Sequence, residues 1–417
     1  MNRKFRFGMS SIMSLVMVAS FAACSTPTTT TTAAGTSAGT TTGTTAAGTT
    51  TATPGETGPI RIGFFAPITG PAAADGLSTS NSADLAIELI NAKGGIGGRK
   101  IELVKYDDAL DTKQAVNIAQ KLTTKDDVVA VVSGSYSGPT RVAAPIFQEA
   151  GIPMLSGYAI HPDVTNSGDF IFSQSFSGAV QGAAGASVAI DMLKAKRISI
   201  IAVDIDFGKQ LAESFTEYAK AHGAEIVSMD KFAMADNEFA PVMTKLKEEI
   251  KPDLIYMANY YGHGAEIARQ AKKLGMTTPI LGTEGIDSFQ FLEIAGADAE
   301  GVMLTTNLNR NSKSASTQDF IKQYTEKYKI MPDMVGASVY DAFEVLFKVI
   351  GDVGTDPIKM RDGIKSLKNF ETVTGNLIEY APSREAIKPV EIQIIKDGKF
   401  TFFGEITDLT IITPKAR

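Results

Sequence analysis

The chain has 417 residues, 44% of them hydrophobic and 21% charged, which is enough apolar material for about two to four globular domains. Its net charge of −6, without a run dense in Lys and Arg, argues against a nucleic-acid-binding protein. The single Cys, Cys24, excludes an internal disulfide, and three scattered His without an H-E-x-x-H motif give no indication of a metal site.

The first 24 residues have the three-part pattern of a secretory signal. A basic start at residues 3–6 precedes an apolar stretch over residues 7–21 and a small-residue end. The last four residues, Phe21-Ala22-Ala23-Cys24, resemble the bacterial lipobox, in which the Cys thiol is lipidated before cleavage, with Phe21 in place of the usual Leu. We therefore predict a lipoprotein signal peptide over residues 1–23 and lipidation of Cys24. An uncleaved anchor is the alternative, because the stretch is at the short limit for spanning a bilayer.

Residues 25–53 have a very restricted composition. They comprise sixteen Thr, six Ala, four Gly, two Ser and one Pro, without a charge or a large apolar side chain. Such a segment cannot bury enough apolar surface to offset the entropy lost on folding. We therefore predict that residues 24–58 are a lipid-anchor Cys followed by a disordered tether. Whether its Thr and Ser carry O-glycans is left open.

Beyond Pro59 the chain alternates predicted strands and helices. Short apolar or β-branched runs predict strands, and apolar residues at helical spacing predict helices. In chain order these are strand 60–66, helix 80–93, strand 101–106, helix 112–124, strand 128–132, a loop of small residues over 133–138, a helix ending at Glu149, and strand 152–155. Strands that alternate with helices indicate βαβ units around a parallel sheet.

The same alternation starts again at Gly178. The predicted elements are helix 178–193, strand 197–203, helix 207–222, strand 225–229, helix 238–250, strand 254–258, helix 262–274, strand 279–281, helix 288–294 and strand 302–305. We therefore expect two doubly wound α/β lobes in series. Open α/β sheets bind ligands at the carboxyl ends of their strands, so two such edges facing each other would form a ligand-binding cleft.

The motifs of several enzyme classes are missing. The first strand-to-helix turn, Ala66-Pro-Ile-Thr-Gly-Pro-Ala72, does not match the dinucleotide-binding G-x-G-x-x-G pattern. The Gly-rich segment 94–98 ends a helix and reads as a helix cap with a turn. Neither a P-loop nor G-x-S-x-G occurs in the sequence. The Ser-rich turn at 133–138 has no evident His partner, so a hydrolase stays an alternative without support.

That Ser-rich turn fits a different role. It joins a predicted strand to a helix, where small residues let a ligand approach the backbone and the helix N-terminus offers N–H groups and a positive dipole end. Ser137 is placed either as an ordinary N-cap or as a donor to a ligand. A small carboxylate would suit such a site.

A series of short motifs extends over nearly the whole body from Pro59. They are Ala66-Pro-Ile-Thr-Gly-Pro71, Asn91-Ala-Lys-Gly-Gly-Ile-Gly-Gly98, Tyr106-Asp-Asp108, Ile152-Pro-Met-Leu-Ser156, Phe207-Gly208, Pro252-Asp253, Arg269-Gln-Ala-Lys-Lys-Leu-Gly275 and Thr283-Glu-Gly285. In order and spacing they resemble the branched-chain amino-acid (Leu/Ile/Val) solute-binding proteins of bacterial ABC transporters. The resemblance implies a non-enzymatic protein without a cofactor or metal. It also implies the type I periplasmic-binding-protein fold, an α/β fold of two doubly wound parallel-sheet lobes joined by a three-crossover hinge.

This fold implies a particular division of the chain. Lobe 1 would comprise residues 59–177 plus 307–386, and lobe 2 residues 178–306 plus 387–417. The hinges would lie near residues 175–178, 306–309 and 386–388, where the chain passes from one lobe to the other.

The resemblance also implies a set of ligand-binding residues. Ser137 with nearby backbone N–H groups would hold an α-carboxylate, Glu284 would hold the α-ammonium, and Tyr260 would lie against the ligand. Physically, an amine in a closed and dry cleft needs a carboxylate within hydrogen-bond reach. Tyr136 and Tyr158 would line the cleft near Ser137.

Several positions depart from the family pattern. Ile160, beside Tyr158 and Ala159, stands where a head-group Thr is frequent, and Phe207 replaces a Tyr of the second lobe. Ser173 and Gly178 replace an Arg and an Asp at the lobe crossover. Asp75 replaces an aromatic residue near the first turn, so it either favours a polar or basic ligand or faces solvent. The predicted ligand-binding set is therefore Asp75, Tyr136, Ser137, Tyr158, Ala159, Phe207, Tyr260 and Glu284.

Together these features predict an extracytoplasmic, lipid-anchored and monomeric solute-binding protein, on the cell surface or in the periplasm. It would capture an amino acid of branched-chain type, or a related small carboxylate, and deliver it to the permease and ATPase of an ABC importer. The alternatives are a non-amino-acid ligand, such as an amide, urea or an aromatic acid, and a role as a sensory receptor subunit.

Overall fold

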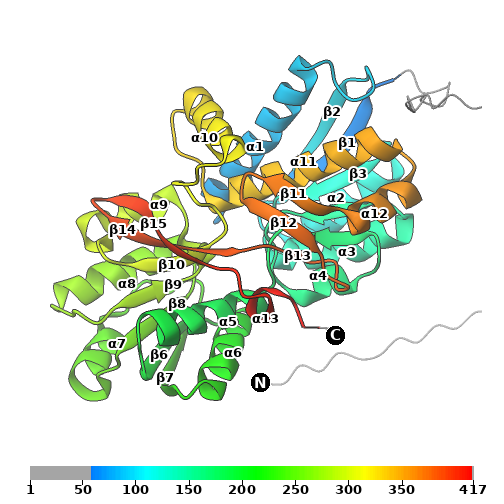
Figure 1. Cartoon of the computed structure of the whole chain (residues 1–417). Coiled ribbons are helices and arrows are strands. Elements are labelled where there is room, and N and C mark those ends of the chain that lie inside the picture. Colours follow the sequence, from blue (N-terminus) through cyan, green and yellow to red (C-terminus); the bar gives the residue numbers. More distant parts are fainter. Residues whose placement is uncertain (1–57, 416–417) are drawn as a thin grey trace, which may run out of the picture. The chain divides into compact units, whose positions relative to one another are not determined.

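The computed structural model describes residues 58–415, which form two large sheets and one small sheet surrounded by helices (Figure 1). The predicted signal peptide, Cys24 and the tether lie outside the described residues. None of the helices between residues 58 and 415 combines the length and apolar character needed to cross a bilayer.

The first large sheet, on which we define lobe 1, has five parallel strands in the order β2-β1-β3-β4-β5. Its strands are β1 (Ile60–Ala66), β2 (Ile101–Asp107), β3 (Ala130–Ser133), β4 (Met154–Ser156) and β5 (Ile171–Ser173). Alternate side chains of β1 enter different cores: Ile62 and Phe64 enter one, and Phe65 enters the other. Both faces of the sheet are therefore covered, as a doubly wound fold requires.

Helices cover the two faces of this sheet. They are α1 (Ala73–Ala92), α2 (Thr112–Thr124), α3 (Ser137–Ala150), α4 (Pro162–Asn166), α10 (Ala315–Tyr328), α11 (Met334–Val353) and α12 (Pro357–Ser366). Helices α1 and α11 pack against each other in one core, and α2 packs against α3 in the other. A small antiparallel sheet lies against the first core and contains β11 (Lys368–Thr372), β12 (Gly375–Tyr380) and β13 (Ala386–Ile387).

The second large sheet, on which we define lobe 2, has seven strands in the order β15-β14-β10-β9-β8-β6-β7. Its strands are β6 (Arg197–Val203), β7 (Glu225–Phe232), β8 (Leu254–Ala258), β9 (Ile280–Gly282), β10 (Met303–Thr306), β14 (Val390–Lys396) and β15 (Lys399–Ile406). The first five are parallel, as expected, but β14 and β15 are antiparallel. The tight turn at Asp397-Gly398, where both residues have positive φ, reverses the chain between them.

The helices of lobe 2 are shorter, and two of them change type along their length. The elements are α5 (Gly178–Ser187), η1 (Val188–Met192), α6 (Asp206–Ala221), α7 (Ala240–Lys245), η2 (Leu246–Ile250), α8 (Tyr261–Lys273), η3 (Glu284–Ile286), α9 (Phe289–Ala295), η4 (Gly296–Ala299) and α13 (Leu409–Ile412). The helices predicted over 178–193 and 238–250 each continue as a π-helical turn, η1 and η2. The other two short elements, η3 and η4, are 3₁₀ turns.

Helix α1 begins at Ala73, so the predicted start at residue 80 was wrong. The first two turns contain Gly76, Ser78 and Thr79, a composition typical of a loop. Here these residues are buried because α1 lies close to the strand-to-helix turn and to α11. A Cβ on Gly76 would lie 2.0 Å from the Pro67 carbonyl oxygen, and the Ser78 hydroxyl donates to Asp333. Asp75 therefore belongs to the first turn of a helix.

The chain passes three times between the two large sheets within the part that the structure describes: after β5, after β10 and after β13. Figure 1 shows the last passage as the C-terminal segment, in red, which runs from the small sheet into the sheet of lobe 2. A buried polar contact ties each passage to lobe 1. These contacts are Tyr380 Oη to Gln174 Oε1 (2.7 Å), Asn307 Nδ2 to Ser338 Oγ (2.7 Å) and Lys388 Nζ to Asp341 Oδ2 (3.3 Å).

The Lys388–Asp341 pair is the most demanding of these contacts, because both side chains are completely buried. Asp341 also accepts hydrogen bonds from the backbone N–H groups of Val373 and Thr374. Burial lowers the pKa of Lys388, and the neighbouring carboxylate opposes that shift. Several hydrogen bonds therefore hold the pair in place. The loss of one partner would leave the other charged group buried and unpaired.

We expect Lys388→Met to reduce the free energy of unfolding by about 3–5 kcal/mol, because it leaves Asp341 buried without its cation. Urea denaturation of the purified protein measures this change. Lys396→Met, at the exposed end of β14, is the matched control and should change stability little. Equal unfolding midpoints for the two variants would contradict a stabilising role for the pair.

Candidate functional site

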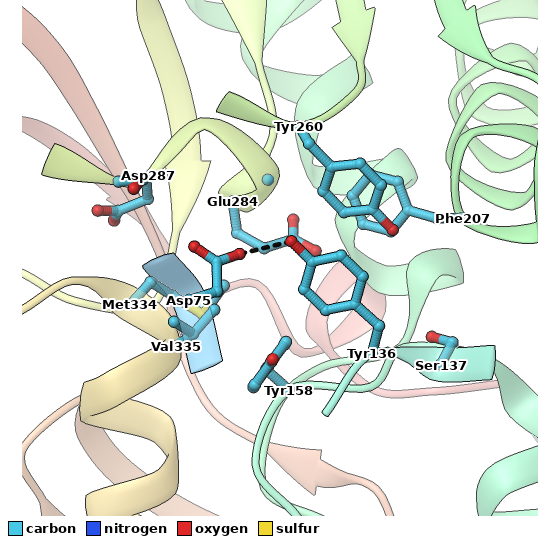
Figure 2. A pocket seen from close by; sticks show the side chains of 12 residues that line it. Asp75, Tyr136, Ser137, Tyr158, Phe207, Tyr260, Glu284, Asp287, Met334 and Val335 are labelled. Carbon is cyan, nitrogen blue, oxygen red and sulfur yellow. Dashed lines mark hydrogen bonds between the residues drawn. The ribbon is translucent and has the colours of Figure 1, made fainter. Parts of the chain in front are cut away.

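A small cavity of about 30 Å³ lies between the two lobes (Figure 2). Twelve residues from both lobes line it: Asp75, Tyr136, Ser137, Tyr158, Phe207, Tyr260, Glu284, Gly285, Asp287, Ser288, Met334 and Val335. Seven of the eight residues predicted from the sequence are in this set. The other one, Ala159, is buried beside it, and its backbone N–H donates to Ser156 Oγ.

The lobe 1 side chains come from the carboxyl ends of three neighbouring strands. Asp75 lies in the first turn of α1 after β1, Tyr136 follows β3, and Tyr158 follows β4. Tyr136 is the N-cap residue of α3 and Ser137 is the first helical residue, which excludes the alternative that Ser137 is an ordinary N-cap. The backbone reason is that Tyr136 has extended φ and ψ angles and the helix begins at Ser137, one residue earlier than a Ser137 cap would need.

Ser137 instead joins two segments of lobe 1. Its Oγ accepts hydrogen bonds from the backbone N–H groups of Ile160 (3.2 Å) and His161 (3.3 Å). A hydroxyl oxygen has two acceptor positions and one hydrogen to donate. Because both acceptor positions are in use, the hydroxyl hydrogen of Ser137 is directed to other partners. The first-turn N–H groups of α3 at Ser137 and Gly138 have no intrahelical acceptor either.

The lobe 2 side chains also come from the carboxyl ends of strands, on the opposite side of the cavity. Phe207 lies in the first turn of α6 after β6, Tyr260 is the N-cap residue of α8 after β8, and Glu284 begins η3 after β9. Thr283 fixes this last turn, because its side chain accepts a hydrogen bond from the Gly285 N–H. Both lobes therefore present the carboxyl ends of their strands to one cavity.

Three aromatic rings form a continuous stack across the cavity. Phe207 stacks on Tyr260 with ring centroids 4.6 Å apart, and Tyr260 stacks on Tyr136 at 4.8 Å. Tyr158 then meets the Tyr136 ring edge-on at 5.9 Å. Because Tyr260 and Phe207 belong to lobe 2 and Tyr136 to lobe 1, the stack joins the two lobes directly.

Glu284 is the most unusual side chain of the site. It is only 5% exposed, and its Oε2 has no hydrogen-bond partner among residues 58–415. Burial raises the pKa of its carboxyl group to about 8, and the negative charge of nearby Asp287 adds to the shift. A buried carboxylate without a partner is costly, so this geometry fits a site that receives a cation or a hydrogen-bond donor from a ligand.

Asp75 is the second buried carboxyl group of the cavity. It is 5% exposed, which excludes the alternative that it faces solvent. Burial and the charge of Asp333 raise its pKa to about 7, while a hydrogen bond donated by the Tyr136 hydroxyl, 2.6 Å from Oδ2, opposes the shift. Figure 2 shows this bond across the middle of the site.

Asp287 has a different environment, because Arg310 neutralises it. The Arg310 guanidinium contacts both carboxylate oxygens of Asp287 and also donates to the Pro332 carbonyl. Asp287 was not predicted as a site residue, and neither were Gly285, Ser288, Met334 and Val335. Gly285 is the last residue of the Thr283-Glu-Gly285 motif, and extending that motif by three residues would have found Asp287 and Ser288. Met334 and Val335 begin α11, in a region without predicted elements.

The charged residues of the site are not arranged as a metal centre. Among residues 58–415, no group of three or more His, Cys, Asp or Glu side chains could hold a metal ion. The cavity instead combines carboxyl groups, aromatic faces, a Ser hydroxyl and a helix N-terminus. This combination suits a small ligand that carries both an amine and a carboxylate.

Known proteins are similar to this chain over most of its length. The sequence profile of the periplasmic binding protein family matches residues 59–399. The Leu/Ile/Val-binding protein of Citrobacter freundii is 31% identical over 323 residues, which cover 76% of this chain and 86% of that protein.

Solved structures are similar over an even larger part of the chain. The branched-chain amino acid transporter substrate-binding protein of Streptococcus pneumoniae, in complex with isoleucine, has a TM-score of 0.76 at 29% identity and covers 82% of this chain and 97% of that one. A leucine-binding protein of Thermotoga maritima has a TM-score of 0.76 at 28% identity and covers 84% of this chain and 99% of that one. These similarities confirm the predicted two-lobed α/β architecture.

We expect Glu284→Gln to stabilise the ligand-free protein at pH 8 and to leave its stability at pH 5 nearly unchanged. The folded-state pKa of Glu284, about 8, lies above the ordinary value of 4.5. The contribution of Glu284 to the stability of the folded state is therefore fully present below pH 4.5, and it is lost as the pH rises to about 8. The neutral Gln avoids that loss.

Thermal unfolding at pH 5 and at pH 8, with and without the substitution, measures this difference. Glu249→Gln, at an exposed position on η2, controls for the general effect of removing one negative charge. If wild type and Glu284→Gln lose the same stability between the two pH values, Glu284 is already ionised and satisfied in the ligand-free protein.

Proposed function

This chain belongs to the periplasmic binding protein family, and from that premise we propose that it captures an amino acid between its lobes for an ABC importer. The observation that carries the proposal is Glu284, a buried carboxyl group with an unpartnered oxygen inside the interlobe cavity. The related proteins are substrate-binding proteins of transporters, so the chain is a binding protein and not an enzyme. The family is extracytoplasmic.

The proposed ligand contacts divide between the lobes. Glu284 of lobe 2 binds the α-ammonium through a charge-assisted hydrogen bond. In lobe 1 the Ser137 hydroxyl and the first-turn N–H groups of α3 bind the α-carboxylate, helped by the positive end of the helix dipole. The predicted site residues Tyr136, Tyr158, Phe207 and Tyr260 supply the apolar walls. Ala159, behind the cavity wall, would act only by positioning its neighbours.

Capture requires the lobes to move. The cavity of about 30 Å³ is too small for an amino acid, since the Phe207–Tyr260–Tyr136 stack fills the space between the lobes. In the proposed cycle the stack separates, the ligand enters, and the lobes close over it by bending at the three passages of the chain. Closure is favoured because the ligand contacts both lobes only in the closed state.

The remaining parts of the proposal concern the whole chain. Lobe 1 would comprise residues 59–177 plus 307–386 and lobe 2 residues 178–306 plus 387–417. Cleavage before Cys24 and its lipidation would anchor the mature chain at the membrane, and residues 24–58 would be the tether. The closed, liganded monomer would then dock on a permease served by its ATPase.

We expect one or more amino acids to raise the thermal midpoint of the purified protein, because a ligand that binds only the folded state stabilises it. Glu284→Gln should weaken binding of the best amino acid by roughly 1.5–3 kcal/mol, the range of a hydrogen bond to a charged group. Isothermal titration calorimetry measures the loss, with Glu249→Gln as the matched control. Unchanged affinity in Glu284→Gln would mean that the amine is bound elsewhere.

We also expect affinity to increase as the pH rises from 6 to 8. Glu284, with a pKa of about 8 before binding, must lose its proton to pair with an ammonium group, so binding releases a proton. For a single group the change is at most about tenfold per pH unit. Calorimetry in two buffers of different ionisation enthalpy detects the released proton. Binding without proton release at pH 7 would contradict the pairing of an initially protonated Glu284 with the ligand.

A further inference from the structure

We infer that the amino acid captured by this protein carries a second cationic group on its side chain, and that Asp75 selects it. The ligand class would then be the diamino acids, such as lysine and ornithine, and not the aliphatic amino acids. The inference rests on the proposed function and specifies its ligand. Asp75 becomes a specificity-determining residue, distinct from Glu284, which binds the amine common to all α-amino acids.

The first step is the placement of the two carboxyl groups. Asp75 and Glu284 line the same cavity, and each is 95% buried. Asp75 comes from α1 of lobe 1, whereas Glu284 comes from η3 of lobe 2. A ligand that spans the cavity can therefore reach both at once, with its α-ammonium at one and the end of its side chain near the other.

The second step is the charge balance around the cavity. Of its lining residues, all within the part of the chain that the structure describes, none is Lys, Arg or His. Arg310 lies next to the cavity but is paired with Asp287. Asp333, behind Asp75, accepts hydrogen bonds from Ser78 and from the Gly336 N–H at the start of α11. Of the carboxyl groups that line the cavity, Glu284 and Asp75 are thus the two that form no ion pair with a cation of the protein.

The third step compares two kinds of ligand. An aliphatic amino acid brings one ammonium group, which satisfies Glu284 and leaves Asp75 with the neutral Tyr136 hydroxyl as its partner. A buried carboxylate that lacks a cation is destabilising, whereas a paired and hydrogen-bonded one is tolerated. A side-chain ammonium or guanidinium group provides the missing partner, and Tyr136 then orients the Asp75 carboxylate towards it.

The aromatic walls are compatible with such a side chain. The faces of Tyr136 and Tyr260, once separated, can pack against its methylene groups, and a cation near a ring face gains a further attraction. Asp75 titrates within reach of Asp333, Asp287 and Tyr136, and its raised pKa of about 7 follows from burial and from Asp333. A ligand cation would favour its ionised form, so diamino acids should release more protons on binding than aliphatic ones do.

The test uses pairs of amino acids that differ only in the side-chain amine. L-lysine and L-norleucine share one carbon skeleton, and L-ornithine and L-norvaline share a shorter one. Calorimetry on the purified protein at pH 7.5 should show that one of the diamino acids binds about 10- to 100-fold tighter than its amine-free partner, the range for a hydrogen bond to a charged group. In Asp75→Asn this ratio should fall to near one, while Glu284→Gln weakens both members of each pair.

The outcomes separate the inference from the proposed function. If norleucine, norvaline or leucine binds the wild-type protein as tightly as the diamino acids, the inference is wrong and the proposed function stands. A preference for lysine or ornithine that persists in Asp75→Asn would also overturn it. Tighter binding of L-glutamine than of either diamino acid would show that Asp75 binds a neutral donor. If no amino acid binds, the proposed function itself fails. The wild-type comparison decides the matter even if Asp75→Asn does not fold.

Discussion

Two carboxyl groups buried at the junction of two lobes, without a cation from the protein, are the constraint on which the site depends. The doubly wound architecture creates it, because the carboxyl ends of β1 and β9 carry Asp75 and Glu284 into the same cavity. In the proposed cycle, separation of the lobes returns both groups to water. Closure without a ligand therefore works against their desolvation, whereas closure over a cation satisfies them. Binding and lobe closure are in this way two aspects of one electrostatic balance.

The aromatic stack acts in the opposite direction. Stacked rings favour contact between the lobes whether or not a ligand is present, since they remove a large apolar area from water. The arrangement described above thus combines ring stacking, which is favourable, with the burial of carboxyl groups, which is not. Asp75 is linked to both effects, ring stacking and carboxyl burial. The Tyr136 ring that stacks on Tyr260 also carries the hydroxyl that donates to Asp75. A substitution at Asp75 should therefore affect Tyr136, and a substitution at Tyr136 should affect Asp75.

The sequence predicted the regular elements well where the local signal was strong. Strands 197–203 and 254–258 are rich in apolar residues, and helix 112–124 follows an Asp whose side chain caps it, so all three were predicted to the residue. The start of α1 was missed because its small polar residues are buried by contacts that only the folded chain supplies. For the same reason, the sequence could not decide whether Asp75 faces solvent or the cavity.

Most of the residues that line the cavity were among those predicted from the sequence, and some of the others lie where the sequence offered no local signal. Glu284, Tyr260 and Ser137 follow strands directly and were found in this way. Met334 and Val335 reach the cavity from α11, which is distant in the sequence and packs on α1, so its contribution depends on tertiary structure alone. The role of Ser137 also depends on tertiary structure. Its Oγ accepts hydrogen bonds from the backbone N–H groups of Ile160 and His161, and not from those of its own helix.

The stack between Tyr136 and Tyr260 has a consequence for the concentration range in which such a receptor responds. A ligand that enters between these rings must first break their contact, so only the fraction of molecules with separated rings is competent to bind. Apparent affinity is reduced in proportion to that fraction. The strength of the stack thus sets the ligand concentration at which the protein is half-saturated. A weaker stack would allow binding at a lower solute concentration, and a stronger stack would require a higher one.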